Sequence, residues 1–181
     1  MSTFPTRLLI LKRLCDVLEV STPGEANDTF GTLKVFRGRS ILGEEIKPLP
    51  AIAVIESPIT DPGVQYVGDD YEMRRDRLTL LIQGRIADDK NDSTDGETQS
   101  TDVAYWLEAA IESRLARIQA TDNFGKPLYP DEWNLGKLIL DLEIGAPVVR
   151  PPEKSVSSTA FFFLPVRVGI AKQSDQPYTT V

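Results

Sequence analysis

The residue types that most often carry catalysis and metal binding are scarce in this sequence. It has no histidine, which removes the commonest general base and every nucleophile activated by histidine. Its single cysteine, Cys15, has no second thiol with which to bind zinc or form an internal disulfide. Neither of the glycine-rich phosphate-binding motifs is present, and no two carboxylates are spaced for acid–base work. The sequence therefore makes no case for an enzyme or for a bound cofactor.

One segment does carry oxygen ligands of the kind that calcium prefers. Residues 91–96, Asn-Asp-Ser-Thr-Asp-Gly, partly match the EF-hand loop, with candidate ligands at Asn91, Ser93, Asp95 and Asp102. The match fails at both ends, because Asn91 replaces the usual Asp and Asp102 replaces the bidentate Glu. A small calcium-binding module therefore competes with a solvated loop that caps the following helix.

Acidic residues outnumber basic ones, 27 to 20, for a formal net charge of −7. This balance disfavours nucleic acid as a groove-bound partner, because cationic contacts to phosphate supply most of that affinity. The basic residues nevertheless gather locally. They fall near the end of one expected strand and along another: Arg37, Arg39, Arg75, Arg77 and Arg85. Such a group predicts either a solvated strand face or an electrostatic contact between subunits, with the acidic pairs at 69–70 and 88–89 as complements.

Two phenylalanines near the C-terminal end are candidates for a subunit contact. Residues 159–170 are apolar on both sides over their first half, and as a strand they would be about 40 Å long. Phe161 and Phe163 fall on the side opposite the expected core, where a single layer of helices leaves no cover. We expect them in an interface between subunits, although a loop or the second helix of the same chain is the alternative cover. Pro165 cannot donate to a ladder and indicates an edge or a bulge, which would leave a sheet edge open.

Apolar periodicity predicts the elements that would position these residues. Helical spacing falls at 5–19 and 101–118, and strand patterns fall at 32–37, 51–56, 75–87, 137–144 and 159–170. Two helices separated by runs of strands indicate an α+β fold. We expect a single, mostly antiparallel sheet of about five strands, two main helices packed on one face, and long projecting loops at 58–74 and 88–99. The expected organisation is one domain at 1–171 and a flexible tail at 172–181.

The composition is that of an ordinary soluble protein. Hydrophobic residues make up 41% and charged residues 26% of the 181 positions, and no apolar run approaches the ~18 residues that span a bilayer. Cys15 lies within a helical apolar pattern, so we expect a buried thiol in a reducing compartment, the cytosol of the producing cell.

The order of these elements resembles the tail terminator, or tail completion, proteins of tailed bacteriophages. The likeness covers roughly residues 5 to 170 and lies in six segments: TRLLILKRLCDVLEV, KVFRGR, LPAIAVIESP, RLTLLIQGRI, DVAYWLEAAIESRLARI and AFFFLPVRVGI. The resemblance implies a small structural subunit that forms a homo-oligomeric ring, commonly a hexamer, on the head-proximal end of the tail tube. The ring stops polymerisation of the tube protein and offers a docking surface to neck or head-completion proteins.

The same resemblance implies the remaining expectations for this chain. It implies no catalytic residues, no membrane, and location in the neck of the virion after assembly in the host cytoplasm. Genomic DNA would pass through the ring without specific binding, which an acidic bore would suit. Another neck or head–tail connector subunit remains the alternative, since such proteins have similar size and composition.

Overall fold

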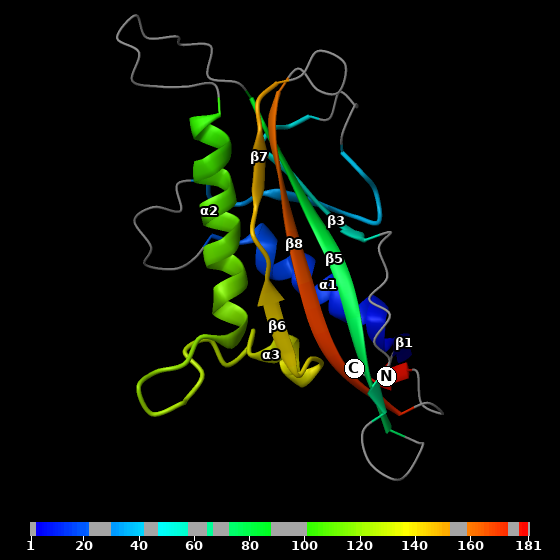
Figure 1. The fold of residues 1–181 in the computed structure, drawn as a ribbon. Helices are drawn as coiled ribbons and strands as arrows, with labels where there is room; N and C mark the ends of the chain where they lie inside the picture. The colour runs from blue at the N-terminus through cyan, green and yellow to red at the C-terminus, as the bar shows by residue number, and fades with distance from the viewer. Residues whose placement is uncertain are drawn as a thin grey trace, which may run out of the picture.

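The computed structural model describes residues 3–21, 30–41, 47–57, 65–66, 73–87, 101–152, 159–173 and 178–180. These residues form the expected α+β fold (Figure 1). In chain order the elements are β1 (Thr3–Pro5), α1 (Thr6–Glu19), β2 (Lys34–Arg37), β3 (Ala51–Glu56), β4 (Gln65–Tyr66), β5 (Met73–Ile86), α2 (Asp102–Ala116), the 3-10 turn η1 (Arg117–Gln119), α3 (Asn134–Lys137), β6 (Asp141–Ile144), β7 (Val148–Arg150), β8 (Ala160–Gln173) and β9 (Tyr178–Thr180).

The main sheet is mixed. Its strand order is β2-β3-β5-β8-β6, with β4 also paired to β5 and β7 to β8. The centre is a pair of 14-residue strands, β5 and β8, that run antiparallel over their whole length. The other described pairs are also antiparallel except β2 with β3, which is parallel. The α+β class is therefore confirmed, and the parallel pair is the feature that the strand pattern did not predict.

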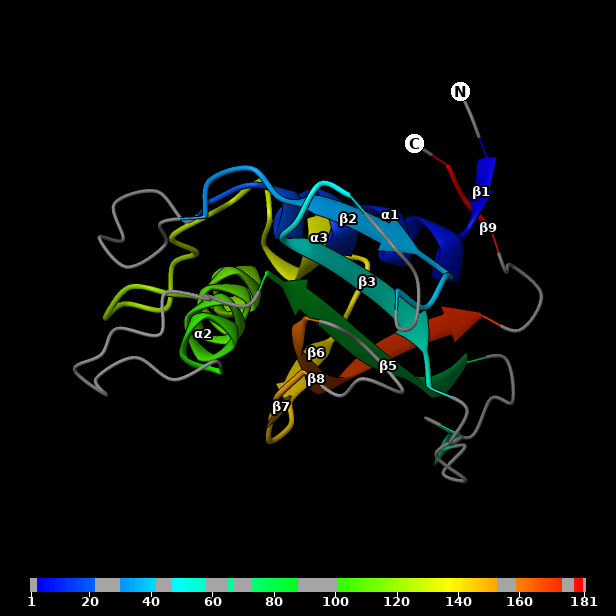
Figure 2. The same cartoon turned by 90° about the horizontal axis from the view of Figure 1, so that it is seen from above.

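Both long helices pack on the same face of this sheet. Leu14 of α1 and Ile111 of α2 are fully buried and share one cluster with strand residues such as Leu80 and Leu164. Two views at right angles show α1 and α2 in different orientations on that side (Figures 1 and 2). Packing is close enough to require a glycine, because a Cβ at Gly84 would lie 2.0 Å from the ring of its cross-strand partner Phe162.

Two buried arginines, Arg114 of α2 and Arg117 of η1, bind the end of α1. Arg114, which is fully buried, donates hydrogen bonds of 2.6 Å to the carbonyl oxygens of Leu18 and Gly31. Arg117 donates at 2.9–3.1 Å to carbonyl oxygens at the same helix end, those of Val17, Val20 and Ser21. The last carbonyls of a helix have no partner within it, so these guanidinium groups satisfy backbone acceptors that would otherwise be orphaned.

The strand expected at 137–144 is shorter than the sequence pattern predicts. Only Asp141–Ile144 is strand, and the preceding residues Asn134–Lys137 form α3. Asn134, Leu135 and Lys137 have positive φ values of 47°, 52° and 66°, so the backbone turns here instead of extending. The turn places Leu135 and Ile139 in the core, where they are 1% and 3% exposed. A strand with alternating faces would not bury this apolar surface.

Pro165 does not lie on an open edge, because β8 is flanked by β5 on one side and by β6 and β7 on the other. The Pro165 carbonyl accepts a 2.8 Å hydrogen bond from Gly145 N, beyond the end of β6. Since N and O of one strand residue face the same side, the missing N–H of Pro165 faces residues 145–147, the interruption between β6 and β7. The expectation of an edge here was wrong, and the interruption is the physical reason that a central strand tolerates proline.

Two parts of the segment expected as a flexible tail, 172–181, are strand in the structure. β8 continues to Gln173, and residues Tyr178–Thr180 form β9, which pairs antiparallel with β1. The pairing joins Thr3 to Thr180 in register, as a small ribbon beside α1 (Figure 2). Backbone pairing with a distant segment is not visible in the polar composition from which the tail was predicted.

Candidate interaction surface on the second face of the sheet

The sheet has a second face, opposite the helices, that contains four of the residues singled out from the sequence, Arg77, Arg85, Phe161 and Phe163. Strand register and alternation place these side chains on it: Ala51, Ala53 and Ile55 of β3, Arg77, Thr79, Leu81, Gln83 and Arg85 of β5, and Phe161, Phe163, Pro165 and Arg167 of β8. One end of this face is covered by another segment of the chain, and the other end holds a groove.

One end of the second face is covered by the segment that follows β2. Arg85 is 4% exposed and donates from Nη1 to the Ile41 carbonyl at 2.8 Å and from Nε to Thr159 Oγ1 at 3.0 Å. Gln83 Oε1 accepts hydrogen bonds from Ser40 Oγ at 2.9 Å and from Ile41 N at 3.2 Å. Ile41 itself is fully buried in a small apolar cluster with residues of β3. We call this region the covered end.

Phe161 belongs to the covered end and is only 3% exposed. Its ring meets the partly buried ring of Phe163 edge to face, with centroids 5.5 Å apart. The expectation that this face lacks cover within the chain is therefore wrong for Phe161, because a segment distant in sequence folds over the end of the face where it lies. A subunit contact at these residues stays a prediction, and in this arrangement it would involve Phe163 before Phe161.

The opposite end of the second face holds a groove of about 390 Å³. Its lining comes from the ends of β3 and β6 and the middles of β5 and β8: Ser57, Thr79, Glu143, Ile144, Gly145, Pro165 and Arg167. Backbone hydrogen bonds fix its walls, from Ser57 N to Thr79 O at 2.9 Å and from Gly145 N to Pro165 O at 2.8 Å. We call this region the open-end groove.

The open-end groove combines apolar and charged walls with one unsatisfied polar atom. Thr79 Oγ1 is buried and has no hydrogen-bond partner in the part of the chain that the structure describes. At the rim, Arg77 and Glu143 approach to 3.9 Å with side chains 41% and 52% exposed, an ion pair that adds little stability at such exposure. A buried hydroxyl without a partner is uncommon, since most such groups are hydrogen-bonded.

The structure divides the basic residues that the sequence grouped together. Arg77 is exposed beside the groove, whereas Arg85 is buried at the covered end and is not part of a solvated cationic face. Arg37 and Arg39 are exposed, but Arg37 pairs with Val54, whose side chain faces the helices. The side chain of Arg75 and the acidic pairs at 69–70 and 88–89 lie outside the described residues.

Most of the candidate calcium ligands lie outside the residues that the structure describes, so the calcium hypothesis stays untested. Asn91, Ser93 and Asp95 lie outside the described residues, and Asp102 is the first residue of α2, where a carboxylate favours the helix N-terminus. Within the described ranges, no three His, Cys, Asp or Glu side chains group in a way that could hold a metal ion.

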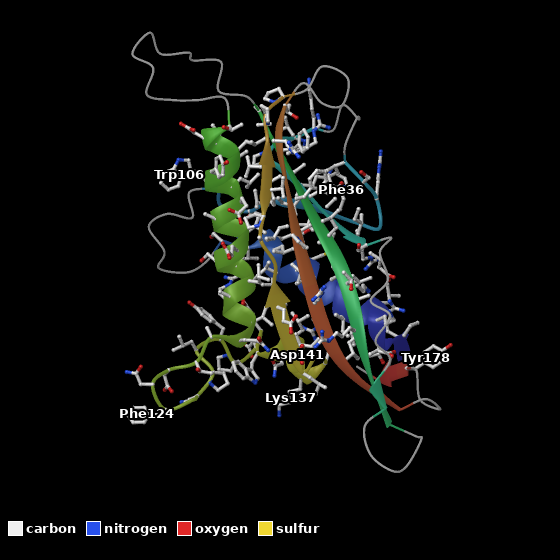
Figure 3. The ribbon with its side chains drawn as sticks, in the orientation of Figure 1. Phe36, Trp106, Phe124, Lys137, Asp141 and Tyr178 are labelled. Atoms are coloured by element: carbon white, nitrogen blue, oxygen red, sulfur yellow. The ribbon has the colours of Figure 1, made fainter. Side chains whose placement is uncertain are left out.

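Residues 121–127, within a segment that the sequence predicts to be rich in turns, form a projecting turn that we call the finger; its exposed aromatic tip was missed by sequence reasoning. Phe124 at its tip is 95% exposed and points away from the sheet (Figure 3). Asp122 Oδ1 accepts hydrogen bonds of 2.9 Å from the backbone N–H groups of Phe124 and Lys126, and Gly125 adopts φ of 78°. Aspartate and glycine at these spacings predict a turn, but no sequence signal indicates that the turn presents an aromatic ring to solvent.

No helix among the described residues is both long and apolar enough to span a membrane. Comparison of the sequence with models of protein families and with curated proteins gives no match.

Proposed function

We propose that this chain is a structural virion protein, a tail terminator subunit that assembles into a ring on the end of a bacteriophage tail tube. The ring would stop polymerisation of the tube protein and present a docking surface for neck or head-completion proteins. Support comes from the resemblance in element order and from a fold with two long helices on one face of a sheet with two long central strands.

The observation that carries this proposal is the open-end groove. Helices cover one face of the sheet, and a loop segment covers one end of the other, but the groove leaves strand residues of four elements open to a partner. Arg77 and Arg167 are exposed there on a chain of net charge −7. Opposite charges across an interface set register and suppress wrong pairings, as a closed ring of identical subunits requires.

The charge balance also suits a channel for DNA. A net charge of −7 gives a surface that repels phosphate at short range. A ring of such subunits would let genomic DNA pass without specific binding.

The proposal is tested by asking whether the purified chain forms a discrete ring and whether that ring limits tube growth. Light scattering and negative-stain images would be recorded for the chain alone and with the tail tube protein of the same virus. We expect a single closed oligomer, and tubes that stop growing with one end capped when the chain is added. The double variant Arg77→Glu with Arg167→Glu should weaken both, whereas Arg13→Glu, an exposed position on α1, should weaken neither.

A chain that stays monomeric at its solubility limit and never binds a tube end would overturn the proposal. Rings that bind purified neck proteins but leave tube length unchanged would instead identify another neck or connector subunit.

A further inference from the structure

The finger is a hydrogen-bonded turn that exposes its tip residue, Phe124, to solvent. Backbone hydrogen bonds from Asp122 N to Lys126 O and from Leu128 N to Ala120 O close it, at 2.9 Å each. Together with the two bonds to the Asp122 carboxylate, they hold the tip in one shape. A phenylalanine 95% exposed on such a tip loses little conformational entropy on binding, because the backbone that carries it is already fixed.

The open-end groove has the properties of a site for one aromatic side chain. Its volume of about 390 Å³ lies near the lower end of the range for ligand pockets, roughly 300–1,000 Å³. Pro165, Ile144 and the backbone of Gly145 provide apolar walls, and the Arg167 guanidinium is available at the wall to lie over a ring. Gly145 keeps the groove open, because a Cβ there would approach Pro165 Cγ to 3.0 Å.

Charges beside the two features are complementary. Lys126 follows Phe124 by two residues and is exposed, and Glu143 forms an exposed wall of the groove. An incoming finger would thus supply an aromatic ring to the apolar walls of the groove and a cation to the exposed Glu143 carboxylate.

We propose that the finger of one subunit inserts Phe124 into the open-end groove of a second copy of this chain. The inference rests on the proposed ring function and specifies its subunit contact. Finger and groove are different surfaces, so the contact is head-to-tail, the type that closes into a ring when the rotation between subunits permits. The finger supplies the anchor of the interface, not its full area, since one aromatic residue buries about 150–250 Å² and a stable interface about 800 Å² per partner.

Variants at both surfaces test this contact by sedimentation or mass photometry of the full chain. Phe124→Ser should raise the dissociation constant at least about tenfold, as expected for a buried aromatic anchor. Thr79→Phe, which fills the groove, should have a similar effect while circular dichroism remains that of the folded chain. Trp106→Ser is the matched control, because Trp106 is 59% exposed on α2, away from the finger (Figure 3), and it should leave assembly unchanged. Assembly that is equally weakened by Trp106→Ser would overturn the contact.

A photocrosslink tests the contact directly and does not depend on any variant that might fail to fold. With p-benzoylphenylalanine in place of Phe124, we expect crosslinks between chains at peptides containing residues 57, 79, 143–145 or 165–167. Crosslinks between chains at other peptides would overturn the inference while leaving the ring proposal intact. Crosslinks at the groove in a chain that never caps tubes would support the contact and count against the tail terminator function. A wild-type chain that forms neither oligomer nor crosslink overturns both.

Discussion

The two faces of the main sheet are built by alternate residues of the same strands, yet they are stabilised differently. The helix-covered face is filled by aliphatic and aromatic side chains from both long helices and the central strands. The second face instead holds Arg85 and Gln83 at its covered end, each bonded to the segment after β2. At its other end it keeps a groove.

The helix-covered face stabilises the fold by close packing, whereas the second face is only partly filled. Close packing on the helix-covered face leaves no room for change, since even one Cβ is excluded at Gly84. Directed hydrogen bonds fix one end of the second face, and a groove remains at its other end. Four tests, directed at β5 and at the helices, measure how far this contrast extends.

The largest loss of stability is expected for Gly84→Val on the helix-covered face. Its Cβ would fall 2.0 Å from the Phe162 ring, so overpacking should lower the free energy of unfolding by about 3 kcal/mol. Urea denaturation measures this. Thr79→Val, on the same strand but facing the groove, should change the value by no more than about 0.5 kcal/mol, because its hydroxyl has no partner among the described residues. Equal losses for the two variants would remove the contrast between the faces.

Arg85→Met should give the next largest loss, about 2 kcal/mol, because it leaves the Ile41 carbonyl and Thr159 hydroxyl without their buried donor. Amide exchange at residues 38–41 should become faster in this variant, as the covered end loosens. The exposed Arg167 is its counterpart at the open-end groove, and Arg167→Met should stay within about 0.5 kcal/mol of wild type. Unchanged exchange at 38–41 would show that apolar contacts of Ile41 alone hold the segment in place.

Glu108, unlike Arg85, is a buried polar group that should lower the free energy of unfolding. It is 6% exposed on α2, and burial, with a smaller contribution from Glu112, raises the pKa of its carboxyl. The folded state therefore binds the proton more tightly than the unfolded state, so this group makes the protein less stable as pH rises through the ordinary and then the raised pKa. Glu108→Gln should stabilise at neutral pH, with an advantage that shrinks as pH falls through the raised pKa toward the ordinary glutamate pKa and is absent below it. Thermal melts from pH 4 to 8 measure it; an advantage independent of pH would contradict this assignment.

The smallest effect concerns Cys15, which packs against the core from α1. Burial raises the pKa of its thiol to about 11, so only about one molecule in a thousand carries the reactive thiolate at pH 8. Iodoacetamide should therefore modify the native chain far more slowly than the urea-unfolded chain. Equal rates would show that α1 opens readily from the sheet.

The sequence predicted those parts of the fold that depend on local periodicity. Alternation in residues 75–87 and 159–170 indicated the long central strands, and the 3.6-residue spacing of Leu107, Ile111 and Leu115 indicated α2. The features that the sequence did not predict depend on contacts between distant segments. The cover over Arg85 includes Ile41, which lies 44 residues earlier in the chain. Strand β9 pairs with β1 near the opposite end of the chain.

The candidate site was less predictable for a related reason. Phe161 and Phe163 have the strand spacing of an uncovered apolar face, but spacing cannot show whether a loop crosses that face. Phe124 sits alone in a turn-rich connector, where one aromatic residue forms no pattern. The groove itself consists of residues from four strand ends or centres, and no single segment contains its signal.

The two arginines that satisfy the last carbonyls of α1 lie 96–100 residues further along the chain. During synthesis at about 5–20 residues per second, the first helix would wait roughly 5–20 seconds before these partners leave the ribosome. Contacts this distant in sequence slow folding. The N-terminal helix is therefore expected to remain exposed on the nascent chain until α2 has been made, and a chaperone that binds apolar helices would meet this segment first.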